Sequence, residues 1–207
     1  MQQKPMIILT GPTAVGKSAL SVELAKKING AVISADSMQV YRHMDIGSAK
    51  IRPEEMCGVP HYLIDVLDPS EEFHVVKFVE LAHEAMEKIY AAGQIPIVTG
   101  GTGFYIQALL KEVDFTESHG ELPIRKELEE KAATVYGAAE LYQKLSEVDP
   151  ASAETIHPNN VKRVIRALEY YYETGQKISE HNEEQKQKES PYCSAYFVLN
   201  DERSILY

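Results

Sequence analysis

A run of residues near the N-terminus has the types and spacing that bind phosphate. Residues 11–18 read Gly-Pro-Thr-Ala-Val-Gly-Lys-Ser and match the P-loop pattern G-x-x-x-x-G-K-[ST]. Glycines let the backbone N–H groups of such a loop point inward at anionic oxygens, and the following helix N-terminus adds partial positive charge. Lys17 adds a full charge, and the Ser18 hydroxyl can coordinate a Mg²⁺ ion that the phosphates also bind. We therefore expect a diphosphate or nucleotide site formed by Gly11, Pro12, Thr13, Ala14, Val15, Gly16, Lys17 and Ser18.

The segments on either side of this loop are the ones that a phosphate site requires. Residues 6–10 are an apolar, strand-sized run, and a helix is expected from Lys17 to a stop at Asn29-Gly30. The alternative is a glycine turn that merely precedes a helix. The strand, loop and helix in this order favour the phosphate site.

A carboxylate follows the second predicted strand, residues 31–37. Asp36 lies near the carboxyl end of that strand, where ligands gather in open α/β sheets. If this strand neighbours the strand before the P-loop, Asp36 faces the phosphate site as a general base or a Mg²⁺ partner. The alternative is an aspartate that caps the following turn.

A fourth predicted strand, residues 94–99, runs into Gly100-Gly101-Thr102. Many P-loop hydrolases carry a metal-linked aspartate at this place, so the usual ATPase interpretation loses support. Two glycines suit a close approach of the backbone to a ligand, with Thr102 as a hydroxyl donor. A plain glycine turn is equally compatible with these residues.

A basic segment occurs on a predicted helix between residues 159 and 174. Pro158 and Asn159 mark the helix start. Arg163 and Arg166 lie one turn apart with Lys162 adjacent, as phosphate binders along an RNA backbone would. The alternative is a solvated basic face without a ligand.

The order of predicted elements indicates an α/β fold. A third strand over 59–67, a helix over 71–92 and a helix through 105–110 complete a P-loop NTPase-like parallel sheet flanked by helices. Charged helical segments near 123–134, 137–147 and 159–174 follow without strands, then a polar run over 173–190 that we predict to be a mobile connector. A last strand, 193–199, rejoins the sheet, and residues 204–207 resemble the start of another helix. The predicted organisation is an α/β core over 1–112, a helical insertion over 113–190 and a return strand over 191–207, and we expect the chain to be truncated.

Composition limits the function classes. The chain has 207 residues and a net charge of −10, which argues against indiscriminate binding to nucleic acid but allows a local basic surface. Cys57 and Cys193 lack metal-ligand spacing, so we predict buried free thiols and no zinc site. The apolar runs are strand-sized and no signal peptide is evident, so we expect a soluble cytoplasmic protein without a membrane segment.

Together, the motifs resemble those of the tRNA dimethylallyltransferases of bacterial type, also called tRNA isopentenyltransferases. The segments that carry the resemblance fall in family order from residue 7 to about 200: GPTAVGKS, ISADSMQVYRHMDIGSAK, HYLID, TGGTGFYIQALL and EVDPASAETIHPNNVKRVIRALE. Ser48, Thr99 and Asn160 depart from the usual pattern without removing a proposed catalytic group. Family members continue for about a third of their length beyond the last matching segment, which implies that this chain lacks the C-terminal part.

The resemblance implies transfer of a dimethylallyl group from dimethylallyl diphosphate to the exocyclic amine of the adenosine immediately 3′ of the tRNA anticodon. The P-loop and Mg²⁺ would hold the diphosphate, Asp36 would be the general base, and Lys17 and Thr102 would complete the catalytic set. The helical insertion would bind the anticodon stem-loop, and we expect a monomer. The implied tRNA-binding residues are Asp36, Ser37, Met38, Gln39, Lys162, Arg163, Val164, Ile165 and Arg166.

Three alternatives stay open at the level of sequence. An ATP-dependent nucleoside or nucleotide kinase shares the P-loop, but its lid normally presents arginines, for which only Arg125, Arg163 and Arg166 are candidates. An adenylate isopentenyltransferase would act on a free nucleotide, whereas the basic helical insertion favours tRNA. A non-enzymatic chain would bind diphosphate or tRNA without turnover.

Overall fold

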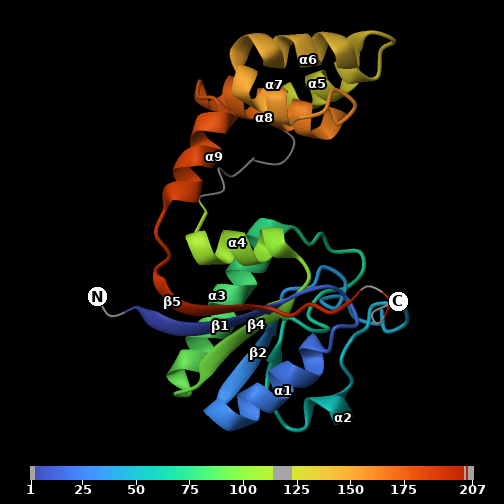
Figure 1. Ribbon diagram of the computed structural model, residues 1–207. Helices are drawn as coiled ribbons and strands as arrows, with labels where there is room; N and C mark the ends of the chain where they lie inside the picture. The colour runs from blue at the N-terminus through green and yellow to red at the C-terminus, as the bar shows by residue number, and fades with distance from the viewer. Residues whose placement is uncertain (1–2, 114–122, 203, 205–207) are drawn as a thin grey trace. The chain divides into compact units, whose positions relative to one another are not determined.

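The computed structural model describes residues 3–113, 123–202 and 204, which fall into two units (Figure 1). We call residues up to Val113 together with those from Glu189 the core unit. Residues from Asp114 through Lys188 belong to the helical unit. The two units are described separately.

The described part of the core unit contains one five-stranded sheet in which every strand pair is parallel. The spatial order is β3-β2-β4-β1-β5. The strand bounds are β1 Lys4–Thr10, β2 Gly30–Ser34, β3 His61–Tyr62, β4 Ile95–Gly100 and β5 Tyr192–Val198. Because all carboxyl ends lie at one edge of a parallel sheet, the segments after β1, β2 and β4 meet there.

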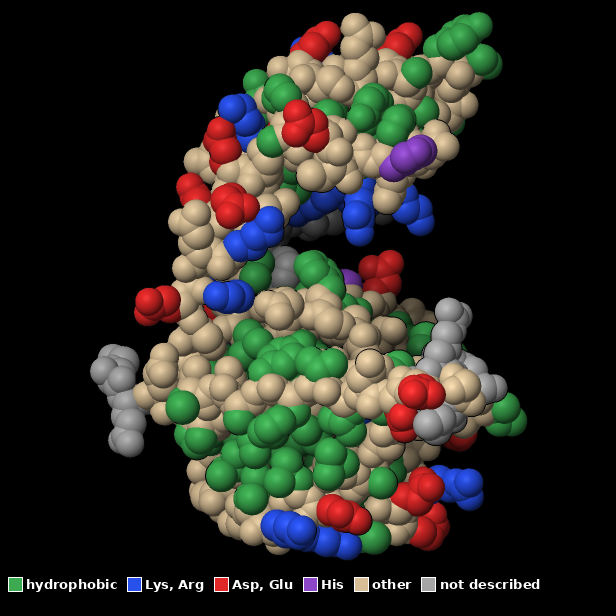
Figure 2. All heavy atoms as spheres, viewed as in Figure 1, with side chains coloured by type: hydrophobic (Ala, Val, Ile, Leu, Met, Phe, Trp, Pro, Cys, Tyr) green, Lys and Arg blue, Asp and Glu red, His purple; other side chains and the backbone are tan. Residues whose placement is uncertain are grey.

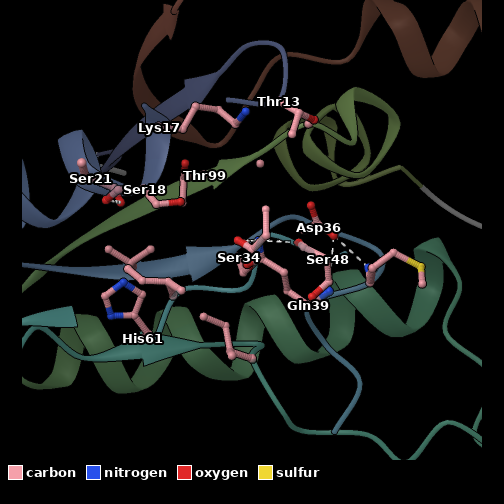
Figure 3. Close-up of a pocket in the computed structure, with 18 of the residues that line it drawn as sticks. Thr13, Lys17, Ser18, Ser21, Ser34, Asp36, Gln39, Ser48, His61 and Thr99 are labelled. Carbon is pink, nitrogen blue, oxygen red and sulfur yellow. Dashed lines mark hydrogen bonds between the residues drawn. The ribbon is translucent and has the colours of Figure 1, made fainter. Parts of the chain in front are cut away.

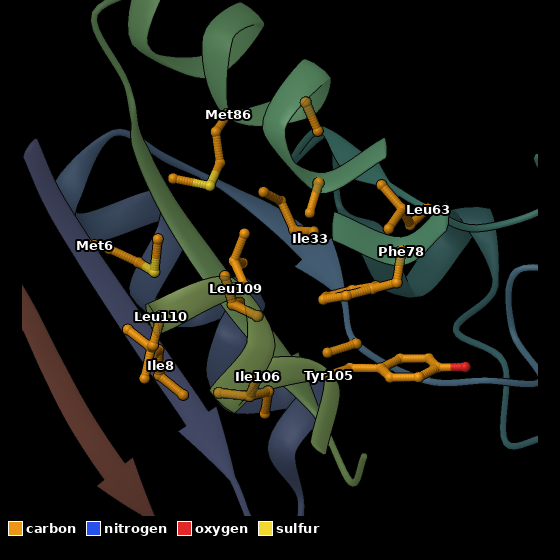
Figure 4. Packing of buried hydrophobic residues seen from close by; sticks show 14 of the residues in the cluster. Met6, Ile8, Ile33, Leu63, Phe78, Met86, Tyr105, Ile106, Leu109 and Leu110 are labelled. Atoms are coloured by element: carbon orange, nitrogen blue, oxygen red, sulfur yellow. The ribbon is translucent and has the colours of Figure 1, made fainter. Parts of the chain in front are cut away.

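Both faces of this sheet are covered by helices, as parallel sheets require. Side chains alternate along β2, so Val32 packs in the cluster with α1 and Ile33 in the cluster with α3 and α4 (Figure 4). Burying one such side chain stabilises the fold by about 1.5–3 kcal/mol. The helices of this unit are α1 Lys17–Ile28, α2 Pro53–Met56, α3 Val75–Ala91 and α4 Gly103–Lys111.

The helical unit has its own apolar core. Leu128, Leu145 and Leu168, from three helices, are buried in it. Gly137 is required at the start of α6, because a Cβ there would lie 1.7 Å from the Lys131 carbonyl oxygen. The described helices are α5 Pro123–Ala132, α6 Gly137–Val148, α7 Pro150–Thr155, α8 Val161–Thr174 and α9 Ile178–Gln187.

The observed third strand, β3, is much shorter than the predicted one. Only His61–Tyr62 of the predicted 59–67 pairs with β2 as a strand. Leu63 and Asp65 adopt positive φ angles of 61° and 54°, which lie outside the extended region. The chain therefore leaves the sheet after Tyr62, although Leu67 forms an isolated bridge with Tyr41.

The predicted connector over 173–190 is wrong, because this run contains the helix α9. Two anchors order its first turn: Ile178 packs on the core of the helical unit, and Ser179 donates two hydrogen bonds to Asp149. Ion pairs one turn apart, Lys177 with Glu180 and Lys186 with Glu183, add support along the exposed side. A polar sequence is helical here because a few tertiary contacts supplement its local pairs.

The C-terminal segment forms the predicted return strand, since β5 pairs in parallel with β1 along its length. The predicted helix start at 204–207 lies outside the described residues except for Ser204. Both cysteines are free, but the expectation that they are buried is wrong, because Cys57 and Cys193 are exposed. Among the described helices, none is long and apolar enough to cross a membrane.

Candidate functional site

The P-loop joins β1 to α1 in a conformation that requires its first glycine. Gly11 has a φ angle of 146°, and a Cβ there would lie 2.2 Å from the backbone oxygen of Leu199. Ala14 and Gly16 also have positive φ angles, 69° and 85°. A non-glycine residue such as Ala14 in this region stores strain, which is common where a loop is shaped for a ligand.

Lys17 places a cation on this loop. Its Nζ donates to the carbonyl oxygens of Gly11 at 2.9 Å and Pro12 at 2.6 Å. Desolvation lowers the pKa of Lys17, and the nearby charge of Asp36 acts in the opposite direction. The ammonium group is therefore fixed at the loop, within the electrostatic field of the Asp36 carboxylate.

A cavity of about 410 Å³ lies at the carboxyl edge of the sheet and includes most of the P-loop (Figure 3). Its polar lining comes from elements far apart in the sequence. These polar residues include Thr13, Lys17, Ser18, Ser21, Ser34, Asp36, Gln39, Ser48, His61 and Thr99. Apolar side chains also line it: Val32, Met38, Ile51 and Ile64. The cavity can thus accommodate an anion at the P-loop together with less polar groups.

Asp36 lines this cavity although the expected strand neighbourhood is wrong. β4 lies between β2 and the P-loop strand β1. Oδ1 of Asp36 accepts hydrogen bonds from the backbone N–H groups of Met38 at 2.8 Å and Gln39 at 3.3 Å, so the aspartate does cap the following turn. Oδ2 has no hydrogen-bond partner among the described residues. One carboxylate therefore caps the turn with one oxygen and leaves the other available.

The loop after Asp36 is held by its own side chains. The Gln39 side chain accepts from the Ser34 hydroxyl at 3.2 Å and donates to the Ala49 carbonyl oxygen at 3.1 Å. Met38, 43% exposed, contributes its side chain to the cavity lining. Gln39 therefore positions this loop, while Met38 can contact a bound substrate.

Lys50 anchors the far end of the same loop. Its side chain is 5% exposed and forms ion pairs with Asp45 at 2.8 Å and Asp65 at 2.6 Å. Burial alone would lower the pKa of Lys50, but hydrogen bonds and charge from these two carboxylates raise it overall. The loop that carries Met38 is thereby tied to the segment after β3.

Gly100 is explained by backbone packing and Thr102 by its place before α4. A Cβ on Gly100 would lie 2.2 Å from the Ala35 carbonyl oxygen, so glycine allows the ends of β4 and β2 to approach. Thr102 precedes α4 and donates its backbone N–H to the same oxygen at 3.4 Å. The cavity lining includes Gly101 but not Thr102. The role of Thr102 in catalysis stays a prediction.

Among the cavity residues that the sequence reasoning missed, Thr99 and His61 have buried polar atoms. Thr99 Oγ1 and His61 Nε2 are buried and have no hydrogen-bond partner among the described residues. His61 Nδ1 lies 2.8 Å from the Val59 carbonyl oxygen, which places the proton on Nδ1. Burial lowers the pKa of His61, so its Nε2 is an acceptor. Each is a polar side chain within a predicted apolar strand, and both strands pair with β2; that polarity was the available signal.

Basic side chains gather along one edge of the helical unit (Figure 2). Lys162 and Arg163 are exposed and have no carboxylate partner among the described residues. Arg166 instead donates to Glu169, a carboxylate only 1% exposed, at 2.9 Å. Arg125 of α5 reaches the same Glu169 oxygen at 3.3 Å. Glu169 therefore orients two guanidinium groups from different helices.

Val164 and Ile165 are corrections to the predicted tRNA-binding set. Their side chains are 1% and 4% exposed and belong to the apolar core of the helical unit. A buried aliphatic side chain stabilises α8 but offers no surface to RNA. Among the predicted residues of α8, the basic ones remain candidates for contact.

The residues at the cavity fit a Mg²⁺ ion that is held mainly by a ligand's phosphates. Ser18 Oγ supplies a hard oxygen atom in the lining and has no hydrogen-bond partner among the described residues. Within the described ranges, no group of three or more His, Cys, Asp or Glu side chains could hold a metal. Mg²⁺ commonly uses few protein ligands together with phosphate and water, which suits this arrangement.

A family model described as IPP transferase matches residues 39–207. Two curated relatives are both named tRNA dimethylallyltransferase. The protein from Lachnoclostridium phytofermentans is 64% identical over 99% of this chain, and that from Bacillus cytotoxicus is 48% identical over 100% of it. The chain spans 65% of the length of each of these relatives.

Solved structures with a similar fold belong to proteins of the same kind. A eukaryotic dimethylallyltransferase described as acting on tRNA is 38% identical, with a TM-score of 0.83 over 95% of this chain and 48% of its own. A tRNA isopentenylpyrophosphate transferase from Bacillus halodurans is 46% identical, with a TM-score of 0.64 over 100% of this chain and 63% of its own. These similarities agree with the parallel P-loop fold described above.

Proposed function

The chain belongs to the IPP transferase family, and from this premise we propose that it transfers a dimethylallyl group from dimethylallyl diphosphate to tRNA. The acceptor is the exocyclic amine of the adenosine immediately 3′ of the anticodon. The observation that carries this proposal is the single cavity that contains both the P-loop cation Lys17 and the open oxygen of Asp36. The transfer needs a cation that stabilises the anionic leaving group and a base that accepts a proton.

The P-loop stabilises the leaving group. As the allylic carbon–oxygen bond breaks, its electron pair goes to the diphosphate, and the allylic carbon gains cationic character. Lys17 and backbone N–H groups of the P-loop stabilise the added negative charge. Because these groups are already held in place, little reorganisation opposes bond breaking.

Asp36 accepts the proton that the nucleophile loses. The adenine amine is a weak nucleophile because its lone pair is delocalised into the ring. As its nitrogen bonds to the allylic carbon, one N–H proton passes to Asp36 Oδ2, while Oδ1 keeps the turn capped. The adenine must leave the anticodon loop to reach this cavity, which costs little in a single-stranded loop.

We propose Mg²⁺ as the cofactor that binds together with the diphosphate. Bound Mg²⁺ supplies Lewis-acid stabilisation of phosphate charge. The Ser18 hydroxyl would hold it, directly or through water, which leaves Asp36 Oδ2 to accept the proton.

The anticodon stem-loop is the proposed partner of the helical unit. Lys162 and Arg163 are exposed cations without carboxylate partners in the described ranges, which suits contact with phosphate. Arg166 and Arg125 share Glu169 and present their remaining N–H groups in a fixed orientation. Ser37 and Met38 are proposed to contact the substrate nucleotide. A monomeric state and a cytoplasmic location stay predictions.

Prenyl transfer to a synthetic anticodon stem-loop tests this function. Mass spectrometry of the RNA should show replacement of one hydrogen by a dimethylallyl group. Asp36→Asn keeps an oxygen for the Met38 N–H and should abolish transfer while sparing diphosphate binding. Glu154→Gln, an exposed carboxylate of α7, is the matched control and should transfer normally. Transfer by Asp36→Asn at the wild-type rate would refute the base assignment.

The same assay separates the alternatives. A chain that modifies adenosine monophosphate but not the stem-loop would be an adenylate isopentenyltransferase. Phosphate transfer from ATP to a nucleoside would indicate a kinase. The comparisons give no support to either alternative.

A further inference from the structure

The Thr99 hydroxyl is a polar group of the cavity that the reaction described above leaves without a role. Its Oγ1 is buried and has no hydrogen-bond partner among the described residues. Buried polar atoms nearly always have a partner, so an exception at a cavity calls for an explanation. Valine would fill the same volume at this strand position without a polar atom and with high strand propensity.

Thr99 lies on the strand next to the P-loop strand. It pairs with Leu9 of β1 and with Ser34 of β2 in parallel register. Side chains in register on neighbouring strands point to the same face of a sheet. Leu9 packs in the cluster with α1, so Thr99 also points toward the α1 side, where the P-loop begins.

The backbone keeps this side chain in place. The Thr99 carbonyl oxygen accepts from the Ala35 N–H at 2.7 Å. The next residue pair of β4 and β1 is Gly100 with Thr10, directly before the P-loop. Thr99 and Ser18 line the same cavity, and both are drawn in Figure 3.

Thr99 lies near the end of the strand beside the P-loop strand, and many P-loop hydrolases carry a metal-linked aspartate at this strand end. A threonine cannot supply that charge, but its hydroxyl can donate to a phosphate oxygen or accept from a metal-bound water. The available chemistry is therefore a single hydrogen bond to the anion or its hydrated metal.

We propose that Thr99 Oγ1 hydrogen-bonds to the diphosphate–Mg²⁺ unit bound at the P-loop. The hydroxyl is a positioning group that gains its missing partner when the ligand binds. This inference rests on the proposed function, in that the ligand is taken to be a diphosphate.

Thr99→Val tests the inference with two readouts. The first is thermal unfolding of the ligand-free protein, and the second is calorimetric titration with inorganic pyrophosphate in the presence of Mg²⁺. Loss of an unpartnered buried hydroxyl should leave the melting temperature unchanged or raised. Loss of a hydrogen bond to a charged ligand should weaken pyrophosphate binding about 5- to 20-fold. Thr99→Ser should restore the affinity.

Thr155→Val provides the matched control. Its Oγ1 donates to the Ser152 carbonyl oxygen at 3.1 Å, so its hydroxyl already has a partner. This variant should lower the melting temperature and leave pyrophosphate affinity unchanged. The opposite signatures of the two threonine-to-valine variants would distinguish a ligand contact from a structural hydroxyl.

The outcomes separate the inference from the proposed function. Wild-type affinity in Thr99→Val overturns the inference alone. Failure of the wild-type chain to bind pyrophosphate overturns both. If Thr99→Val weakens pyrophosphate binding only when Mg²⁺ is present, the hydroxyl contacts the ligand through metal-bound water. If the loss of affinity persists in EDTA, the hydroxyl contacts the phosphate directly.

Discussion

Asp149 is a buried carboxylate that ties two helices of the helical unit together, so its substitution is a strong test of the structure. It is 1% exposed and accepts four hydrogen bonds from two serines. The backbone N–H and hydroxyl of Ser152 donate at 3.1 and 2.7 Å. Those of Ser179 donate at 3.0 and 2.6 Å. Asp149 thereby caps α7 and anchors the first turn of α9.

Asp149→Asn should destabilise the helical unit measurably. Each carboxylate oxygen accepts from one backbone N–H and one hydroxyl, and asparagine retains only one such oxygen. The amide group can donate to a serine hydroxyl but cannot accept from the second backbone N–H. An orphaned buried donor and the lost charge assistance together cost about 2–4 kcal/mol. Asp149→Ala removes all four bonds and should cost about 3–5 kcal/mol.

Urea denaturation followed by circular dichroism, with hydrogen exchange at the Ser179 amide, measures this effect. Glu147→Gln is the control, because its ion pair with Lys144 is exposed and should contribute less than about 1 kcal/mol. Burial alone would raise the pKa of Asp149, but the hydrogen bonds from Ser179 and Ser152 lower it below its ordinary value of 3.8. Its stabilising effect is thus complete above that value and is lost as pH falls through the folded-state pKa. An Asp149→Asn variant as stable as the wild type would refute this account.

Four further predictions concern the cavity and the basic surface. Lys17→Met should weaken pyrophosphate binding about 100-fold by calorimetry, with the fold unchanged by circular dichroism, because it removes the full charge of the loop. Burial lowers the pKa of His61, so stability should fall as pH drops below its ordinary value of 6.5, and His61→Gln should flatten that dependence in melting curves. Glu169→Gln leaves two guanidinium groups without their shared carboxylate and should cost about 2–4 kcal/mol in urea denaturation. Lys162→Ala with Arg163→Ala should reduce the salt slope of stem-loop binding by about 1.5 to 2, whereas an unchanged slope would make these residues a solvated face.

Local features of the core unit were predictable because short segments determine them. The P-loop was recognisable from glycine and lysine spacing, and α1 begins at Lys17 as expected. Asp36 was predicted either to cap a turn or to face the site, and the structure has it do both. The alternatives were not exclusive because a carboxylate has two oxygens.

Features that depend on distant contacts were not predictable. Placing β4 between β1 and β2 is a property of the sheet order, which no local pattern encodes. Arg125 of α5 and Arg166 of α8 both form ion pairs with Glu169, and these contacts join two helices that are far apart in sequence. Val164 and Ile165 are an exception, because with Val161 and Leu168 they have the spacing of one apolar helix face, which indicates burial rather than RNA contact.

The central claim is that this P-loop serves a prenyl diphosphate, and a competition titration tests it most directly. Dimethylallyl diphosphate and ATP would be titrated against each other in the presence of Mg²⁺, with Lys17→Met as the control for binding at the P-loop. The account predicts that dimethylallyl diphosphate binds more tightly and displaces ATP. A clear preference for ATP would contradict the account and would favour the nucleoside or nucleotide kinase alternative.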